Sequence, residues 1–266
     1  MRRIALVNQK GGVGKTTTAV HLAAGLARLG KSVLLVDLDP QANATLSLGV
    51  RPHELRASTY SVLTGASSAA NVIVPVSPGL SLLPASIDLA GAEMELSGAI
   101  GREYILRNAL EGIPVTEFVL VDSPPSLGLL SVNGLTYVDE VFIPVQCEFL
   151  ALHGLSLLLR TVELVKRRLH PPLAVTGVIA CLYDGRKALA RESVRELESH
   201  FGERLYRTRI RTNVRLAEAP SHGQTIFDYA PDSYGAEDYL NLSREILGLP
   251  AAEPALTVSP APAAGV

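Results

Sequence analysis

The chain has 266 residues, of which 47% are hydrophobic and 19% are charged, with a formal net charge of −2. This composition excludes an intrinsically disordered protein, and no segment approaches the roughly 18 apolar residues that cross a bilayer. The two cysteines, Cys147 and Cys181, lie far apart in the chain and have no metal-ligand spacing, so we expect both to be reduced and buried in a cytosolic protein.

The first expected strand, residues 4–7, leads into the glycine-rich loop KGGVGKTT at residues 10–17. Glycines let backbone N–H groups turn toward phosphate oxygens, and the helix expected over residues 16–29 adds the positive end of its dipole. Lys15 is then expected to reach the β- and γ-phosphates and the Thr16 hydroxyl to ligate Mg²⁺. Gln9 replaces the first glycine of the standard motif, and an extra lysine, Lys10, follows it. The loop predicts an ATP–Mg²⁺ site, and the alternative is a glycine-rich turn that binds nothing.

Two further apolar strands end in aspartate. The strand at 32–38 is followed by Asp39 and contains Asp37, and the strand at 118–122 ends at Asp122. Open α/β sheets hold ligands beyond the carboxyl ends of their strands. We therefore expect Asp122 to hold Mg²⁺ through its water shell, as a Walker B carboxylate does. For each aspartate the alternative is a turn-capping role, and for Asp37 a structural role is preferred.

The remaining apolar runs predict strands at 140–145 and 174–181, and helices at 152–169, 187–201 and 236–247. Residues 64–80 are rich in Gly, Ser and Pro and predict a loop-rich insertion. Alternating strands and helices predict a doubly wound, mostly parallel α/β sheet flanked by helices, like that of P-loop NTPases, in one domain over residues 1–249. Residues 250–266 are rich in Pro and Ala and predict a disordered tail.

Positive charge is concentrated in one part of the chain. Residues 160–215 contain 13 Lys/Arg and 6 Asp/Glu, whereas residues 1–159 contain 10 and 13, and residues 216–266 contain 1 and 7. Such a segment suits sequence-independent contact with DNA phosphates. The alternative is a solvated helix face, because Glu192, Glu196 and Glu198 alternate with the arginines.

The loop KGGVGKT resembles the deviant phosphate loop of the ParA/MinD class of ATPases. DLDPQANAT at 37–45, DSPPSLGLLSVNGL at 122–135, IPVQCEFLALHGL at 143–155 and NVRLAEAPSHG at 213–223 resemble the ParA/Soj partitioning ATPases, over about residues 2–248. The resemblance implies an ATP-dependent homodimer that binds double-stranded DNA non-specifically. It also implies slow ATP hydrolysis, stimulated by a ParB/Spo0J-like centromere-binding protein, and a cytoplasmic, nucleoid-associated location without membrane binding.

The resemblance also implies roles for particular residues. Lys10 would reach the partner subunit's nucleotide, and Asp39 would orient the attacking water and contact the Mg²⁺ shell. The expected catalytic residues are Lys10, Lys15 and Asp39, and the expected metal-site residues are Thr16, Asp39 and Asp122. The expected nucleotide-binding residues are Lys10, Gly11, Gly12, Val13, Gly14, Lys15, Thr16, Thr17 and, for adenine, Asn213. The expected DNA-binding residues are Arg186, Lys187, Arg211 and Arg215.

Two related functions compete with this prediction. A MinD-like, membrane-associated cell-division regulator would need a basic amphipathic C-terminal helix, and no Lys or Arg follows Leu249. An iron–sulfur carrier ATPase would need clustered cysteine ligands, which Cys147 and Cys181 do not provide. His153 and His222 lack metal-binding spacing and are expected to be structural.

Overall fold

Short runs of Val, Leu and Ile form the strands at the centre of the fold, as the computed structural model shows for residues 1–148 and 154–251. β2 and β5 are buried at every position, which is typical of parallel strands covered on both faces. The strands are β1 (Arg2–Leu6), β2 (Val33–Asp37), β3 (Val74–Ser77), β4 (Leu80–Leu83), β5 (Phe118–Asp122), β6 (Glu140–Gln146), β7 (Ala174–Tyr183) and β8 (Leu205–Arg211).

These strands form one eight-stranded sheet in the order β3-β4-β2-β5-β1-β6-β7-β8. β3 is antiparallel to β4, and the other neighbouring strands run parallel. β5, β1 and β6 lie side by side at the centre, so the loops after β1, β2 and β5 meet at one edge of the sheet. Ligands bind at this edge in doubly wound folds.

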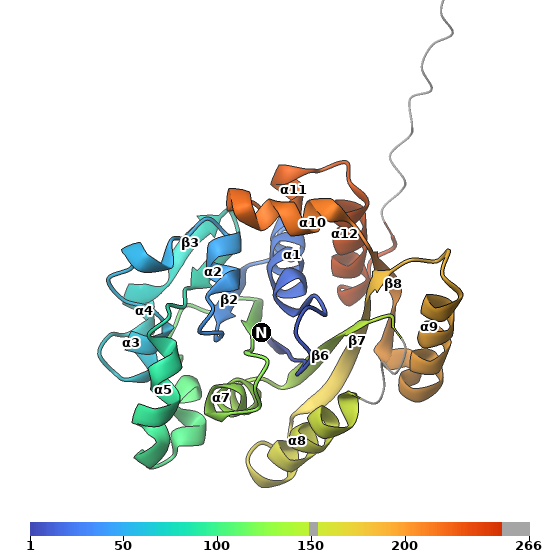
Figure 1. Ribbon diagram of the computed structural model, residues 1–266. Helices are drawn as coiled ribbons and strands as arrows, with labels where there is room; N and C mark the ends of the chain where they lie inside the picture. The colour runs from blue at the N-terminus through green and yellow to red at the C-terminus, as the bar shows by residue number, and fades with distance from the viewer. Residues whose placement is uncertain (149–153, 252–266) are drawn as a thin grey trace, which may run out of the picture.

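Helices cover both faces of the sheet, and Figure 1 shows α1 and α12 on one side and α7 and α8 on the other. Apolar side chains of α1, α2, α11 and α12 pack on the first face, and those of α3 to α9 on the second. The helices are α1 (Lys15–Arg28), α2 (Asn43–Ser47), α3 (Thr59–Leu63), α4 (Ala69–Val72), α5 (Leu89–Glu95), α6 (Ile105–Ala109), α7 (Leu129–Tyr137), α8 (Leu155–Arg168), α9 (Ala188–Phe201), α10 (Val214–Glu218), α11 (Ile226–Tyr229) and α12 (Tyr234–Ile246).

The position of α1 is fixed by close packing against the C-terminal helices. Gly25 lies directly against the Ser243 hydroxyl and the Phe227 ring, so any larger residue there would displace them. The Thr18 and Tyr239 hydroxyls are 3.1 Å apart, and the backbone N–H of Ile226 donates to Nδ1 of buried His21. These contacts hold the start of α1, and therefore the loop before it, in one orientation.

The predicted doubly wound, mostly parallel sheet is confirmed. The prediction of a loop-rich insertion at 64–80 is wrong, because α4, β3 and the first residue of β4 lie there, and β3 and β4 form an antiparallel edge pair. Strand β8 was not predicted, because its alternating arginines were attributed to a charged surface. The prediction of a disordered tail falls on residues 252–266, which lie outside the described residues, as does His153.

Candidate nucleotide-binding site

The loop between β1 and α1 has the backbone shape that a phosphate site needs. Gly12 and Gly14 have φ angles of +75° and +90°, in the left-handed region that favours glycine. Gly14 is the N-cap of α1, no side chain caps the helix, and its first turn contains no acidic residue. The N–H groups at this helix end are therefore available for an anion.

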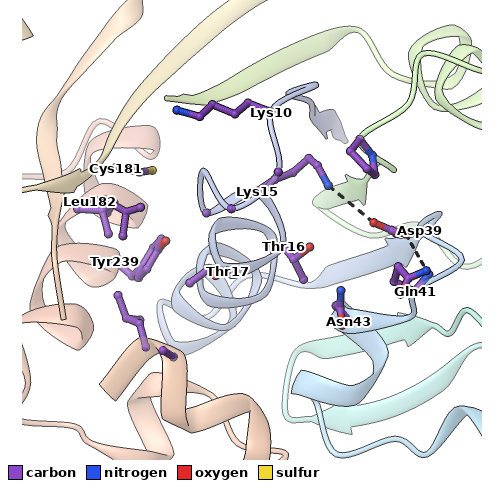
Figure 2. A pocket seen from close by; sticks show the side chains of 17 residues that line it. Lys10, Lys15, Thr16, Thr17, Asp39, Gln41, Asn43, Cys181, Leu182 and Tyr239 are labelled. Carbon is purple, nitrogen blue, oxygen red and sulfur yellow. Dashed lines mark hydrogen bonds and ion pairs between the residues drawn. The ribbon is translucent and has the colours of Figure 1, made fainter. Parts of the chain in front are cut away.

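A pocket of about 370 Å³ opens in front of this loop (Figure 2). The glycine-rich loop and the start of α1 form one side of the pocket, with residues 10–12 and 14–17. Polar side chains after β2 form another side, namely Asp39, Gln41 and Asn43. The structure thus brings together most of the predicted nucleotide-binding residues, although Val13 is buried and does not line the pocket.

Lys15 is buried between Asp39 and Asp122, two of the residues predicted to form the metal site. Its Nζ lies 3.7 Å from Asp122 Oδ1 and 4.0 Å from Asp39 Oδ2. Both Asp122 carboxylate oxygens and the Ser123 hydroxyl are buried with no hydrogen-bond partner among the described residues. Burial raises the pKa of Asp122, and the charge of Lys15 opposes this shift. A buried carboxylate with unused oxygens fits a hydrated cation held beside the phosphates.

The same residues test whether Mg²⁺ fits the site. Thr16 lines the pocket, and its hydroxyl points toward the side of Asp39 (Figure 2). Within the described ranges, no three His, Cys, Asp or Glu side chains form a metal-holding group. The oxygen atoms of Thr16, Asp39 and Asp122 suit Mg²⁺, which is commonly held by one or two protein oxygens together with phosphates and water.

Asp37 and Asp39 have different surroundings although Asp37 ends β2 and Asp39 lies only two residues beyond it. The Asp37 carboxylate accepts hydrogen bonds from the Thr45 hydroxyl at 2.7 Å and from the backbone N–H groups of Thr45 and Asp39. Asp37 therefore shapes the turn between β2 and α2. Its pKa is raised to about 7, mainly by burial and to a smaller extent by the negative charge of Asp122. Asp39 instead extends toward Lys15 and lines the pocket.

Lys10 lines the rim of the pocket, and Figure 2 shows its side chain and that of Lys15 running in opposite directions. The Lys10 side chain is 57% exposed, and its Nζ lies 3.2 Å from Glu148 Oε2. Buried Asn8 sets the start of the loop, because its side chain accepts the Lys10 N–H and donates to the Pro144 carbonyl. No motif in the sequence pointed to Asn8.

The opposite end of the pocket is apolar. It is formed by Cys181, Leu182, Ile210, Leu216, Ala217 and Tyr239. Leu182 has a φ of +54°, which is uncommon for a bulky residue and is found mainly at functional positions. Asn213, predicted to contact adenine, caps α10 by accepting the Arg215 N–H and is not among the residues that line the pocket. The adenine role of Asn213 stays a prediction.

Three of the four predicted DNA-binding residues lie beyond the carboxyl ends of β7 and β8, and Arg211 is the last residue of β8. Arg186 has a 91% exposed side chain, and its hydrogen bonds lower the pKa of Asp184 to about 2. Lys187 is the N-cap residue of α9, and Arg215 on α10 pairs with Glu218 at 2.8 Å. These side chains are exposed at one end of the sheet.

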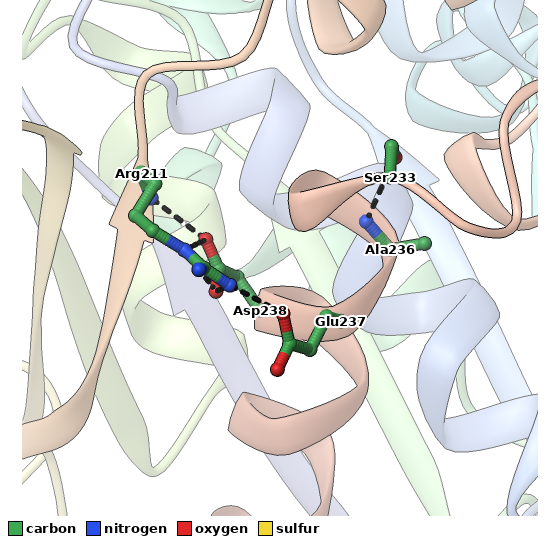
Figure 3. Close-up of polar contacts among 5 residues, drawn as sticks. All are labelled: Arg211, Ser233, Ala236, Glu237 and Asp238. Atoms are coloured by element: carbon green, nitrogen blue, oxygen red, sulfur yellow. Dashed lines mark hydrogen bonds and ion pairs between the residues drawn. The ribbon is translucent and has the colours of Figure 1, made fainter. Parts of the chain in front are cut away.

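Arg211 is engaged within the molecule (Figure 3). Its guanidinium bonds to Asp238 and Glu237 of α12 and lies over the Tyr234 ring, 4.3 Å from the ring centroid. Asp238 is buried, and burial raises its pKa although Arg211 opposes the shift. This geometry favours a structural role for Arg211, and its DNA contact stays an untested prediction.

Comparison with known proteins adds an independent observation. The model of a family described as AAA domain matches residues 1–175. The chromosome-partitioning ATPase Soj of Thermus thermophilus is 51% identical over 93% of this chain and 96% of its own. The chromosome partitioning protein ParA of Caulobacter vibrioides is 44% identical over 93% and 94%. A crystal structure named cobyrinic acid a,c-diamide synthase from Mycobacterium smegmatis, with bound ADP and magnesium, is 38% identical with a TM-score of 0.80, covering 93% and 94%.

Proposed function

This chain belongs to the Soj/ParA family of chromosome-partitioning ATPases, and we propose that it works as an ATP-switched, DNA-binding dimer in DNA segregation. ATP–Mg²⁺ joins two subunits, the dimer holds DNA non-specifically, and hydrolysis to ADP and phosphate releases it. A ParB-like centromere-binding protein accelerates that hydrolysis, and the protein acts in the cytoplasm on the nucleoid. Within the described ranges, no helix is long and apolar enough to span a bilayer.

The pocket residues support the ATP–Mg²⁺ part of this proposal. The N–H groups at the start of α1 and the Lys15 ammonium would hold the phosphates, and Asp122 would hold the metal through water. Bound Mg²⁺ neutralises charge on the β- and γ-phosphates. Asp39 faces the same space from the end of β2, where it can orient a water for attack on the γ-phosphate.

The orientation of Lys10 is the observation that carries the dimer proposal. One lysine of the loop is buried in its own pocket, and the other is exposed at the rim, where it pairs with Glu148. Two ATP molecules facing each other bring together many negative charges, which need cations supplied from both sides. Lys10 is placed to provide such a cation to a second subunit, so dimerisation depends on the γ-phosphate.

The exposed cations near β7 and β8 support the DNA part. Arg186 and Arg215 are exposed side chains whose carboxylate partners are surface groups. Phosphate contacts of this kind bind DNA without reading its sequence, and a dimer doubles their number. Arg186, Lys187 and Arg215 are therefore the residues that we assign to the DNA surface.

Oligomeric state tests this proposal. We expect sedimentation to show monomers with ADP and dimers with ATP and Mg²⁺, and Lys10→Ala to remain monomeric with ATP while still binding it. Lys31→Ala is the control, because Lys31 is a partly exposed lysine that pairs with Glu117 away from the pocket. Dimers of equal stability in ADP, or in Lys10→Ala, would show that Lys10 and the γ-phosphate do not join the subunits.

A further inference from the structure

Helix α5 presents an apolar face to solvent close to the nucleotide pocket. We call Ala90 and Met94 of α5, together with Ile87 in the turn before it, the α5 face; they follow the three- and four-residue spacing that places side chains on one side of a helix. Ile87 is 66% exposed and Met94 is 84% exposed. Leu89 and Ala92 are buried in the core, so this orientation of the helix is fixed. Large apolar side chains grouped on an exposed helix face are typical of an interaction surface.

A hollow of about 290 Å³ adjoins the α5 face. Ala90 and Glu93 of α5 form one wall, and Pro124, Ser126 and Leu130 lie on the β5–α7 side. Asp39, Gln41 and Pro125 line both this hollow and the nucleotide pocket. The hollow is of a size to hold an anchoring side chain, as buried anchors do at protein interfaces. Whatever fills it therefore contacts the loops that position Asp39 and Asp122.

The stretch of sequence that forms the α5 face carries only negative charge, and the cation nearest to it in sequence, Arg102, bonds to the Ser97 carbonyl just beyond α5 and pairs with Glu103. Residues 57–101 contain no Lys or Arg, and their acidic residues are Asp88, Glu93 and Glu95. Within the described ranges these carboxylates accept hydrogen bonds from neutral groups, namely the Ser86 hydroxyl, the Leu130 N–H and the Tyr60 hydroxyl. No ion pair to any of the three is formed there. The surface is complementary to a partner that carries both apolar and cationic side chains.

A second copy of this chain does not match the α5 face in a symmetric contact. In a two-fold interface the same patch faces itself, so the three acidic residues would approach their own copies. Like charges brought together across an interface weaken it. A cationic segment of another protein avoids this repulsion and still covers Met94 and Ile87.

We propose that the α5 face and its hollow are the docking surface for a short cationic, amphipathic segment of the partner that stimulates hydrolysis. This inference rests on the proposed function, because it locates the partner on the ATPase that it activates. An apolar side chain of the segment enters the hollow, and its Lys or Arg side chains pair with Asp88, Glu93 and Glu95.

The contacts of Glu93 give docking a route to the nucleotide pocket. Glu93 Oε1 accepts the Leu130 N–H at 3.1 Å in the first turn of α7, and the Glu93 carboxylate packs directly against Gly128. A cation that draws this carboxylate toward itself weakens its hold on the segment that joins Asp122 to α7. Docking therefore shifts the loop that carries the metal-site carboxylate.

The test uses the full chain and the ParB-like protein encoded in the same genome, at stated salt. Met94→Lys replaces an apolar side chain of the α5 face by a cation that repels the segment, and Asp88→Lys reverses one of the neighbouring negative charges. Leu164→Lys is the matched control, because Leu164 is 60% exposed on α8, which does not line the hollow. Partner binding, partner-stimulated hydrolysis and hydrolysis without partner are measured for each variant.

We expect Met94→Lys and Asp88→Lys to raise the partner concentration needed for half-maximal stimulation at least tenfold, with hydrolysis unchanged in its absence and Leu164→Lys like wild type. Equal stimulation of wild type and both variants would overturn the inference alone. Weaker ATP-dependent dimers in Met94→Lys without partner would assign the α5 face to a second copy instead. If the partner neither binds nor stimulates wild type, the proposed function fails and the inference fails with it.

Discussion

Arg211 and Arg215 were assigned the same role from the sequence, and the structure predicts opposite consequences for their removal. The Arg211 guanidinium is bonded to buried Asp238 and to Glu237, whereas Arg215 pairs at the surface with Glu218. Arg211→Ala therefore leaves a buried carboxylate without its cation, and Arg215→Ala leaves Glu218 in water.

The cost of removing Arg211 follows from this geometry. Breaking a fully buried ion pair by deleting one partner destabilises a protein by about 3–5 kcal/mol. The Arg211 side chain is 38% exposed, so water partly compensates and we expect about 2–3 kcal/mol. For a chain of this size that lowers Tm by about 4–12 °C. Arg215→Ala is expected to leave Tm unchanged.

Calorimetry of the nucleotide-free variants measures the first effect, and DNA binding with ATP, well below Tm, measures the second. Arg215→Ala should lower the slope of log affinity against log salt by about 2, which corresponds to one lost phosphate contact in each subunit of the dimer. Arg211→Ala should keep the wild-type slope. The reasoning is refuted if Arg211→Ala keeps the wild-type Tm and loses DNA binding.

Three further predictions follow from the site. Asp39→Ala should slow hydrolysis and retain the ATP-bound dimer on DNA, and a monomer at saturating ATP would contradict its assigned role. Glu148→Gln frees Lys10 from its own subunit, so the dimer should tighten by up to about fivefold, since exposed ion pairs are worth at most about 1 kcal/mol; a weaker dimer would place Glu148 in the interface. Burial lowers the pKa of His21 from 6.5 to about 3, so between these values the unfolded chain binds the extra proton and stability falls as pH falls. Protonation of His21 in the unfolded chain should therefore lower the free energy of unfolding by about 2 kcal/mol between pH 7 and pH 5. Asp37, with its pKa raised to about 7, contributes the opposite slope in this range, so the check is the difference between wild type and His21→Asn in urea unfolding; equal pH dependence would contradict it.

The sequence predicted the parts of the fold that depend on local pattern. The apolar runs that became β2 and β5 are buried at every position, so their composition alone indicated covered parallel strands. β8 was missed because Arg207, Arg209 and Arg211 alternate with Tyr206, Thr208 and Ile210 in an edge strand, where one face is half-exposed. The β3–β4 pair was missed because Pro75, Pro78 and Gly79 mark a turn and also fit a loop.

The residues of the site likewise divide into those that the sequence predicted and those that only the fold brings together. The phosphate loop, Asp39 and Asp122 stand at strand ends and in a motif, so their approach to one another follows from the topology. The apolar end of the pocket collects residues from β7, β8, α10 and α12, which meet only in the folded chain. The Arg211–Asp238 pair likewise joins residues of β8 and α12, and no periodicity within one segment reveals it.

Nucleotide-dependent DNA binding tests the central claim most directly. Binding of the wild-type protein to a duplex of arbitrary sequence should be compared in ATP–Mg²⁺, in ADP–Mg²⁺ and without nucleotide, at one stated salt concentration. An ATP-switched dimer predicts tight binding with ATP and weak binding in the other two conditions, because only the dimer joins two sets of exposed arginines. Equal binding with ADP and with ATP would contradict the account.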